Sequence, residues 1–170
     1  FNVFEMSVRA VLGQQITVKA ASTLAARLVA VYGTQVQTGI EGLTHSFPAP
    51  AAILALGENI SEHLGKLGII SARANTIYQL ARVLADEKND FGFCGNPEEE
   101  MQKLQAIRGI GSWTAQYIAM RAMGWPDAFL PTDAGIKKAL PDHTPKELQV
   151  LSEAWRPWRS YATVNLWNTL

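Results

Sequence analysis

The stretch IRGIGSWTAQYIAMRA, residues 107–122, sets two glycines one residue apart directly before a run with helical periodicity. The simplest interpretation is a turn between two helices, in which Gly109 ends one helix and Gly111 or Ser112 begins the next. A second interpretation is an anion site, because free N–H groups and the dipole at a helix N-terminus attract phosphate. The hydroxyl of Thr114, in the first turn, would add a donor. The residue pattern leaves both interpretations open.

The helix after this turn has two different faces. At 100° per residue, Trp113 and Tyr117 fall on one face, and Ala115 and Ala119 fall on the opposite face. Packing in a core is the plain explanation of such an aromatic pair. The alternative is that Trp113 and Tyr117 line a cleft.

Helical patterning continues through nearly the whole chain, with no convincing strand alternation. We expect further helices over residues 4–12, 17–32, 51–56, 61–66, 71–86, 97–107, 132–140, 146–155 and 160–169. Residues 34–50 are predicted to be a loop, and DAFLP (127–131) is the best short extended piece. The predicted fold class is therefore all-α, with nine or ten helices.

The composition sets limits on partners and cofactors. The chain has 170 residues, with Lys+Arg and Asp+Glu both at 15, so bulk charge gives no argument for a nucleic-acid partner. Any such partner would be bound by a local surface and by backbone dipoles. Cys94 is the only cysteine, which excludes a disulfide within the chain and a four-cysteine iron–sulfur cluster. His45, His63 and His143 lack metal-site spacing.

Neither a membrane-spanning run of about 18 apolar residues nor a signal peptide is recognisable. We therefore expect a cytoplasmic protein without a membrane partner. The chain opens on Phe1 rather than Met, which is compatible with a piece of a longer protein.

Three stretches together resemble a known family. LQAIRGIGSWTAQYIAMRAMG (104–124) with FLPTDAGI (129–136) resembles the helix-hairpin-helix, Gly/Pro-rich loop and aspartate of the HhH-GPD DNA glycosylases. FEMSVRAVLGQQITVKAA (4–21) resembles the opening of the same domain. WRPWRSYATVNLW (155–167) resembles the closing helices of the DNA-3-methyladenine glycosylase II branch, the AlkA type. The resemblance covers nearly the whole chain in order.

The resemblance implies one HhH-GPD domain over residues 1–170, built from two helical subdomains with a cleft between them. The hairpin would span about residues 97–123. The implied function is base excision repair: the protein flips a damaged base out of double-stranded DNA and hydrolyses its N-glycosidic bond. The expected substrates are alkylated bases of the 3-methyladenine and 7-methylguanine type. We expect a monomer that is associated with the nucleoid.

For the hairpin, the resemblance implies a grip on the DNA backbone through amides around Gly109 and Gly111. In the family, a monovalent cation (sodium or potassium) held by hairpin carbonyls bridges to the phosphate. By position, these carbonyls belong to Gln105, Ile107 and Ile110. Arg108 stands where many members have proline, which puts the family's carbonyl geometry in question here.

Asp133 matches the family's essential aspartate. From the residues alone, Thr132 or Asp133 is an apt N-cap for the helix that follows. The resemblance favours catalysis, and the two roles are compatible because a helix N-terminus favours a negative charge. A carboxylate can stabilise an oxocarbenium-like sugar and can orient or deprotonate the attacking water.

Trp113 and Tyr117, with Trp167, form the expected pocket for the flipped base. An alkylated purine carries positive charge, so stacking on aromatic faces would add roughly 0.5–2 kcal/mol per contact. In the bifunctional members of the family, a lysine precedes the TA of the second hairpin helix, where this chain has Trp113. The resemblance therefore implies a monofunctional hydrolase that leaves an abasic site. Such a hydrolase requires no cofactor. The missing cysteine cluster argues against the iron–sulfur endonuclease III and adenine-mismatch branches of the family.

Gln14 and Gln15 stand in a GQQ turn between two expected helices. They form either a plain polar turn or, by the resemblance, the loop that inserts a side chain into the stack vacated by the base. The residue that matches the inserted one is Gln15. In WRPWRS (155–160), the tryptophans are expected in the core, and the arginines are expected to pack or to form salt bridges.

Two rival functions stay open at this point. One is a glycosylase of the same fold that acts on uracil or hypoxanthine. The other is a non-catalytic DNA-binding helix-hairpin-helix module, which would need no catalytic role for Asp133.

Overall fold

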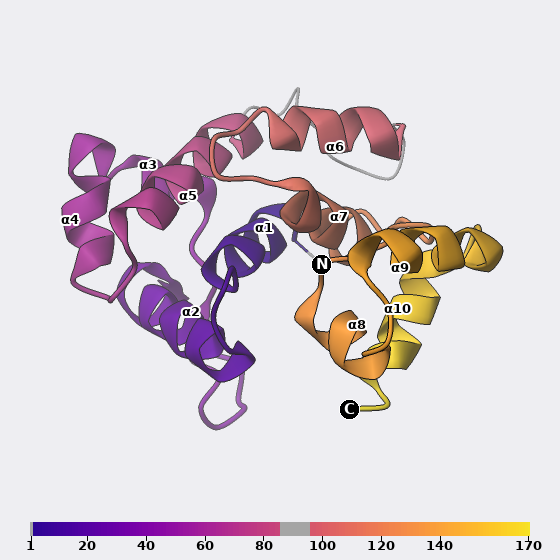
Figure 1. Ribbon diagram of the computed structural model, residues 1–170. Helices are drawn as coiled ribbons and strands as arrows, with labels where there is room; N and C mark the ends of the chain where they lie inside the picture. The colour runs from indigo at the N-terminus through magenta and orange to yellow at the C-terminus, as the bar shows by residue number, and fades with distance from the viewer. Residues whose placement is uncertain (1, 86–95) are drawn as a thin grey trace.

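The computed structural model describes residues 2–85 and 96–170, and these residues are mainly helical (Figure 1). The α-helices are α1 (Val3–Leu12), α2 (Val18–Tyr32), α3 (Pro50–Leu54), α4 (Ile60–Gly65), α5 (Ser71–Leu84), α6 (Pro97–Gln105), α7 (Ser112–Arg121), α8 (Ala134–Ala139), α9 (Pro145–Leu151) and α10 (Arg159–Trp167). Single 3-10 turns, η1 (Gly57–Asn59) and η2 (Ser152–Trp155), adjoin α4 and α9. The predicted all-α class is confirmed.

The structure departs from the expected elements in two small places. Two-residue strands, β1 (Thr34–Gln35) and β2 (His45–Ser46), pair antiparallel inside the region expected to be a loop. Residues 127–131, the expected extended piece, form no strand. Cys94 and the last residue of the expected helix 71–86 lie outside the described residues. In the described part of the chain, no helix is long and apolar enough to cross a bilayer.

Several helices begin at a side chain that caps their free N–H groups. Thr17 accepts from the N–H of Ala20 at 3.2 Å at the start of α2. Thr144 and Glu147 form a reciprocal capping box at the start of α9. The N–H and hydroxyl of Thr144 lower the pKa of Glu147. These short polar signals are why the sequence predicts the helix starts well.

The main core forms around α1, which contacts α2, α5 and α7. Val8 and Val11 of α1 are fully buried, as are Ala115 and Ala119 of α7. The small face of α7 therefore packs in the core, as its periodicity predicted, and its aromatic face is left for the other side. Figure 1 shows α2 to α5 on one side of α1 and α7, and α8 to α10 on the other side.

A second, smaller core holds the C-terminal helices together. Its buried members are Phe129, Ile136 and Leu148, and Trp167 packs against both cores. Trp167 therefore sits at the junction of the two packing units, where side chains from α7, α8 and α10 can meet.

Candidate functional site

Asp133 precedes α8 and is held by N–H donors from three elements. Its Oδ1 accepts from the N–H of Ile136 at 3.1 Å, which confirms the predicted N-cap. The indole N–H of Trp167 donates to the same oxygen at 2.8 Å. The indole N–H of Trp113 donates to Oδ2 at 3.1 Å. The carboxyl group is thus fixed in one orientation while its residue remains partly exposed.

The three aromatic residues predicted to form a base pocket lie together beside this carboxyl group. The rings of Trp113 and Tyr117 stack, with centroids 5.2 Å apart and planes at 18°. The ring of Tyr117 lies 6.4 Å from that of Trp167 at 41°. All three residues are half-buried. The structure therefore joins residues 113, 117, 133 and 167 into one cluster, here called the Asp133 cluster.

The sequence reasoning missed Arg121, which contacts Trp167 of this cluster. Its guanidinium carbon lies 5.3 Å from the centre of the Trp167 ring, a cation–π contact. Arg121 follows Tyr117 by four residues and Trp113 by eight, so it continues the same stripe of α7. Extending the stripe by one more turn would have found it.

Gly135 is also part of the site, because it lets Trp167 approach the first turn of α8. A Cβ at this position would lie 2.6 Å from Cδ1 and 2.8 Å from Nε1 of Trp167. It would also lie 3.0 Å from Oδ1 of Asp133. Atoms do not approach this closely, so any side chain here must displace the indole.

Gly135→Ala is expected to move Trp167 away from Asp133 and to lower any reaction that depends on their contact by at least tenfold. Losing a hydrogen bond of this kind costs about 1 kcal/mol, and the displaced packing adds to it. The measurement is thermal unfolding together with the activity assay described below. Gly65→Ala is the matched control, because that glycine is helical and a Cβ there meets nothing within 4 Å. Equal behaviour of the two variants would contradict the role of Gly135.

The turn between α6 and α7 follows the expectation only at its second glycine. Helix α6 ends at Gln105 with Ala106 as its C-cap, so Gly109 lies in the turn and does not end the helix. Gly109 has φ +96°, and a Cβ there would lie 2.1 Å from Oγ1 of Thr76. That hydroxyl donates to the carbonyl of Arg108 at 3.0 Å. Gly111 is exposed and is the N-cap of α7 without any side-chain cap. The first N–H groups of α7 therefore remain available to an anion.

The polar side chains near this turn are used differently from the expectation. The Gln14 amide donates to the carbonyl of Gly109 at 2.9 Å and to Oγ1 of Thr114 at 3.0 Å. Thr114 is only 2% exposed. Its hydroxyl therefore does not face a ligand, which contradicts the expectation that it would add a donor at the anion site. A buried hydroxyl needs a partner, and Gln14 supplies it, so both side chains brace the hairpin from inside.

Gln15 has the opposite orientation to that of its neighbour. It is exposed and has φ +55°, the one positive φ outside glycine among residues 2–85 and 96–170. This backbone conformation is uncommon for a residue with a side chain. The guanidinium of Arg73, on α5, donates to the carbonyl of Gln14 and so stabilises the turn. The loop thus presents Gln15 to solvent beside the hairpin.

The carbonyls named for a cation lie at the end of α6 and in the turn. Gln105 is the last residue of α6, whose final carbonyls lack helical partners. The carbonyl of Ile107 accepts the N–H of Ile110 at 3.0 Å, which leaves it a second lone pair. Oxygen donors of this kind suit a hard cation, so the donor set is chemically compatible with one.

A buried ion network ties the segment before α8 to α10. Asp127 is 7% exposed, and Arg159 donates to both of its oxygens, at 2.7 and 2.9 Å. Arg156 donates to the same carboxylate and, at 2.7 Å, to Glu153. The bond from Arg156 lowers the pKa of Glu153 and raises the pKa of Arg156 itself. The expectation that these arginines form salt bridges is confirmed.

The expected burial of both nearby tryptophans is only half right. Trp155 is half-buried and packs edge-on against Phe129, with ring centroids 5.6 Å apart. Trp158 is 57% exposed and contacts the exposed ring of Tyr161. Trp158 lies where the chain turns into α10, so its side chain is directed outward while Arg159 takes the buried position.

Comparison with known proteins gives concordant matches. Residues 8–159 match the HhH-GPD superfamily of base excision DNA repair proteins. A Mycobacterium tuberculosis (strain H37Rv) protein named "Probable bifunctional transcriptional activator/DNA repair enzyme AlkA" is 43% identical over 171 residues, which cover 98% of this chain and 33% of that protein. DNA-3-methyladenine glycosylase 2 of Escherichia coli (strain K12) is 36% identical over 168 residues, which cover 99% of this chain and 58% of the relative.

Solved structures show the same arrangement of helices. The 3-methyladenine DNA-glycosylase from Archaeoglobus fulgidus superimposes with a TM-score of 0.84 at 26% identity, over 98% of this chain and 57% of that chain. The Schizosaccharomyces pombe 3-methyladenine DNA glycosylase, solved in complex with abasic DNA, has a TM-score of 0.79 at 22% identity, over 98% of this chain and 80% of that chain. The chain therefore spans between a third and four fifths of the length of these relatives.

Proposed function

Because the chain belongs to the HhH-GPD superfamily of base excision DNA repair proteins, we propose that it removes alkylated bases from double-stranded DNA. It hydrolyses the N-glycosidic bond and leaves an abasic site. The observation that carries the proposal is the Asp133 cluster, a carboxyl group fixed by two indole N–H groups beside three half-buried aromatic rings. Helix α7 begins at the Gly109–Gly111 turn and contributes Trp113 and Tyr117, so one rigid element links an anion site to the aromatic rings.

The reaction proposed for this cluster needs a negative charge next to the sugar and a water molecule as the nucleophile. As the C1′–N bond breaks, the base takes the electron pair and the sugar becomes oxocarbenium-like. Asp133 stabilises this cation and orients a water, whose oxygen bonds to C1′ while its proton passes to the carboxylate or to solvent. An alkylated purine leaves as a neutral base, so no general acid is required. Trp113 and Trp167 fix the direction of the carboxyl group.

The aromatic rings set the class of base and the type of reaction. Stacking on Trp113, Tyr117 and Trp167 favours an electron-poor, positively charged base over a neutral one. Position 113 holds an indole rather than an amine, so the site has no Schiff-base nucleophile there and the strand stays uncut. This selection by stacking is the reason to prefer alkylated bases to uracil or hypoxanthine.

The hairpin and the Gln15 turn provide the grip on DNA. We propose that amides around Gly109 and Gly111 bind a backbone phosphate of the damaged strand, and that Gln15 fills the space of the flipped base. A monovalent cation would be held by three backbone carbonyls and would add positive charge at the phosphate. Those carbonyls belong to Gln105, Ile107 and Ile110.

The test is base release from duplex DNA that contains 7-methylguanine or 3-methyladenine. We expect free base and abasic strands that remain intact until alkali is added. If the protein releases uracil or hypoxanthine but no alkylated base, then its substrate is one of those two bases and not an alkylated base. Strand cleavage without alkali would contradict the monofunctional reaction. Binding to an abasic-site analogue without release from any lesion would favour a non-catalytic DNA-binding module.

A further inference from the structure

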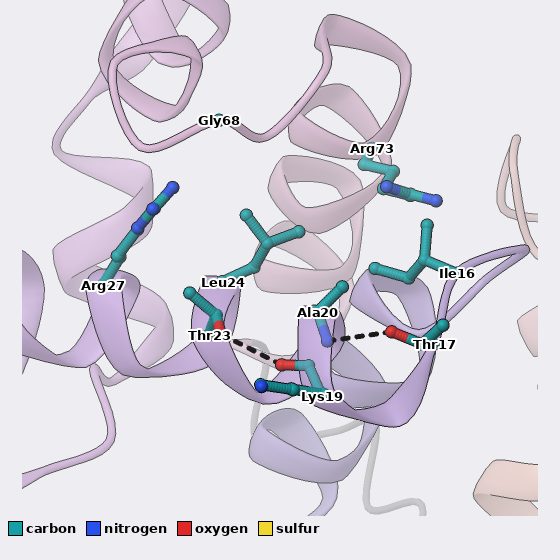
Figure 2. A pocket seen from close by; sticks show the side chains of 9 residues that line it. All are labelled: Ile16, Thr17, Lys19, Ala20, Thr23, Leu24, Arg27, Gly68 and Arg73. Carbon is teal, nitrogen blue, oxygen red and sulfur yellow. Dashed lines mark hydrogen bonds between the residues drawn. The ribbon is translucent and has the colours of Figure 1, made fainter.

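A groove with three cationic side chains runs beside α2, apart from the Asp133 cluster (Figure 2). It is open, has a volume of about 510 Å³, and lies between the first half of α2 and the Gly68 loop. The lining residues that matter here are Ile16, Lys19, Leu24, Arg27, Gly68 and Arg73.

The charge of this groove differs from that of the whole chain. The chain has a net charge of zero, yet the lining has Lys19, Arg27 and Arg73 and no carboxylate. Arg27 donates to the carbonyl of Leu67 at 3.1 Å, which holds its guanidinium at one end of the groove. Figure 2 shows Arg73 at the other end, with Leu24 between the two arginines. Two arginines held by backbone carbonyls, together with Lys19, suit a polyanion.

The groove is continuous with the elements that would contact DNA. Arg73 donates to the carbonyl of Gln14, and the Gln14 amide donates to Gly109 of the hairpin. The exposed Gln15 is followed directly by Ile16, which lines the groove. Gln15 therefore lies between the hairpin, which Gln14 contacts, and the groove, which Ile16 lines. A duplex held with its damaged strand at the hairpin would have its intact strand at the groove.

We propose that this groove binds the sugar–phosphate backbone of the intact strand, opposite the lesion. The proposal rests on the proposed function, because it assumes a duplex held at the hairpin. The cations neutralise phosphates, while Ile16 and Leu24 of the lining present apolar surface to sugars. The groove therefore makes binding depend on the second strand and favours double-stranded over single-stranded DNA.

The test compares the double variant Lys19→Gln, Arg27→Gln with the wild type. The measured quantity is the Kd for a duplex and for a single strand, each with a stable abasic-site analogue, between 50 and 200 mM salt. Losing two phosphate contacts should lower the slope of log K against log salt by about 1.8 for the duplex, equivalent to roughly a thirtyfold loss at 0.15 M salt. We expect the single-strand affinity to change by less than about twofold. Lys19→Gln alone should lower the slope by about 0.9.

The matched control is Lys146→Gln with Arg82→Gln, which also removes one lysine and one arginine from exposed helical positions. Duplex binding by the control should stay close to that of the wild type. An equal loss for duplex and single strand, or an equal loss in the control, would overturn the groove assignment. Failure of the wild type to bind the abasic duplex or to release a base would instead overturn the proposed function. The two failures are therefore distinguishable.

Discussion

Replacing Asp133 by asparagine is expected to reduce base release from alkylated duplex DNA by a factor on the order of 10²–10³ or more, the scale of losing a preorganised electrostatic group. Asparagine is nearly isosteric but neutral, so it cannot offset the charge of the sugar cation. The rate is measured under single-turnover conditions, so that product release does not limit it.

The fold should survive this change, because asparagine caps a helix about as well as aspartate. Its carbonyl oxygen can still accept from Ile136 and Trp167. Its amide group would face the indole N–H of Trp113, and two donors cannot pair, which costs about 1 kcal/mol. Binding to an abasic-site duplex should be unchanged or tighter, since a negative charge near DNA is removed.

A second variant separates the charge from the local geometry. Trp113→Phe removes the indole N–H and keeps an aromatic ring, so combining it with Asp133→Asn relieves the clash between donors. Release by this double variant should remain as low as in Asp133→Asn alone. If Asp133→Asn retains base release within about threefold of the wild-type rate, Asp133 is a helix cap and the assigned mechanism is wrong.

Replacing Asp127 by alanine is expected to destabilise the fold strongly. It leaves the guanidinium of Arg159, whose side chain is 6% exposed, with only the longer 3.3 Å contact to the exposed Glu153. Breaking a buried ion pair from one side costs about 3–5 kcal/mol. For a protein of this size, that loss corresponds to a fall in Tm of roughly 6–20 °C.

The effect of Asp127→Ala should extend to the site. Asp127 belongs to the segment that leads to Asp133, and Arg159 begins the helix that carries Trp167. Loosening this tie should also lower base release at temperatures well below the new Tm. Lys66→Ala is the control, because it removes an ion pair whose two side chains are 67% and 69% exposed and should cost at most about 1 kcal/mol. Similar losses in both variants would show that the Asp127 network is no stronger than a surface pair.

Much of the fold and part of the site could be predicted because they depend on near neighbours in the sequence. The helical periods, the cap at Asp133 and the aromatic stripe of α7 are all short-range patterns, and all of them are seen in the structure. The helix ends were predicted less well: α6 ends at Gln105 where residue 107 was expected, because the last turn of a helix is held by few hydrogen bonds. Arg121 lay within reach of the same pattern but was not singled out.

An all-α chain, a glycine turn before an aromatic helix and an aspartate at a helix start can all be predicted from the sequence, since these features follow from spacing, caps and backbone freedom. Which side chains are free to bind depends instead on how the helices pack. The packing buries Thr114 against Gln14, 100 residues away, and it sets Trp167 against Gly135 and Asp133. It also lines one groove with Lys19, Arg27 and Arg73. Such contacts depend on how helices distant in the sequence pack, and no local period encodes that packing.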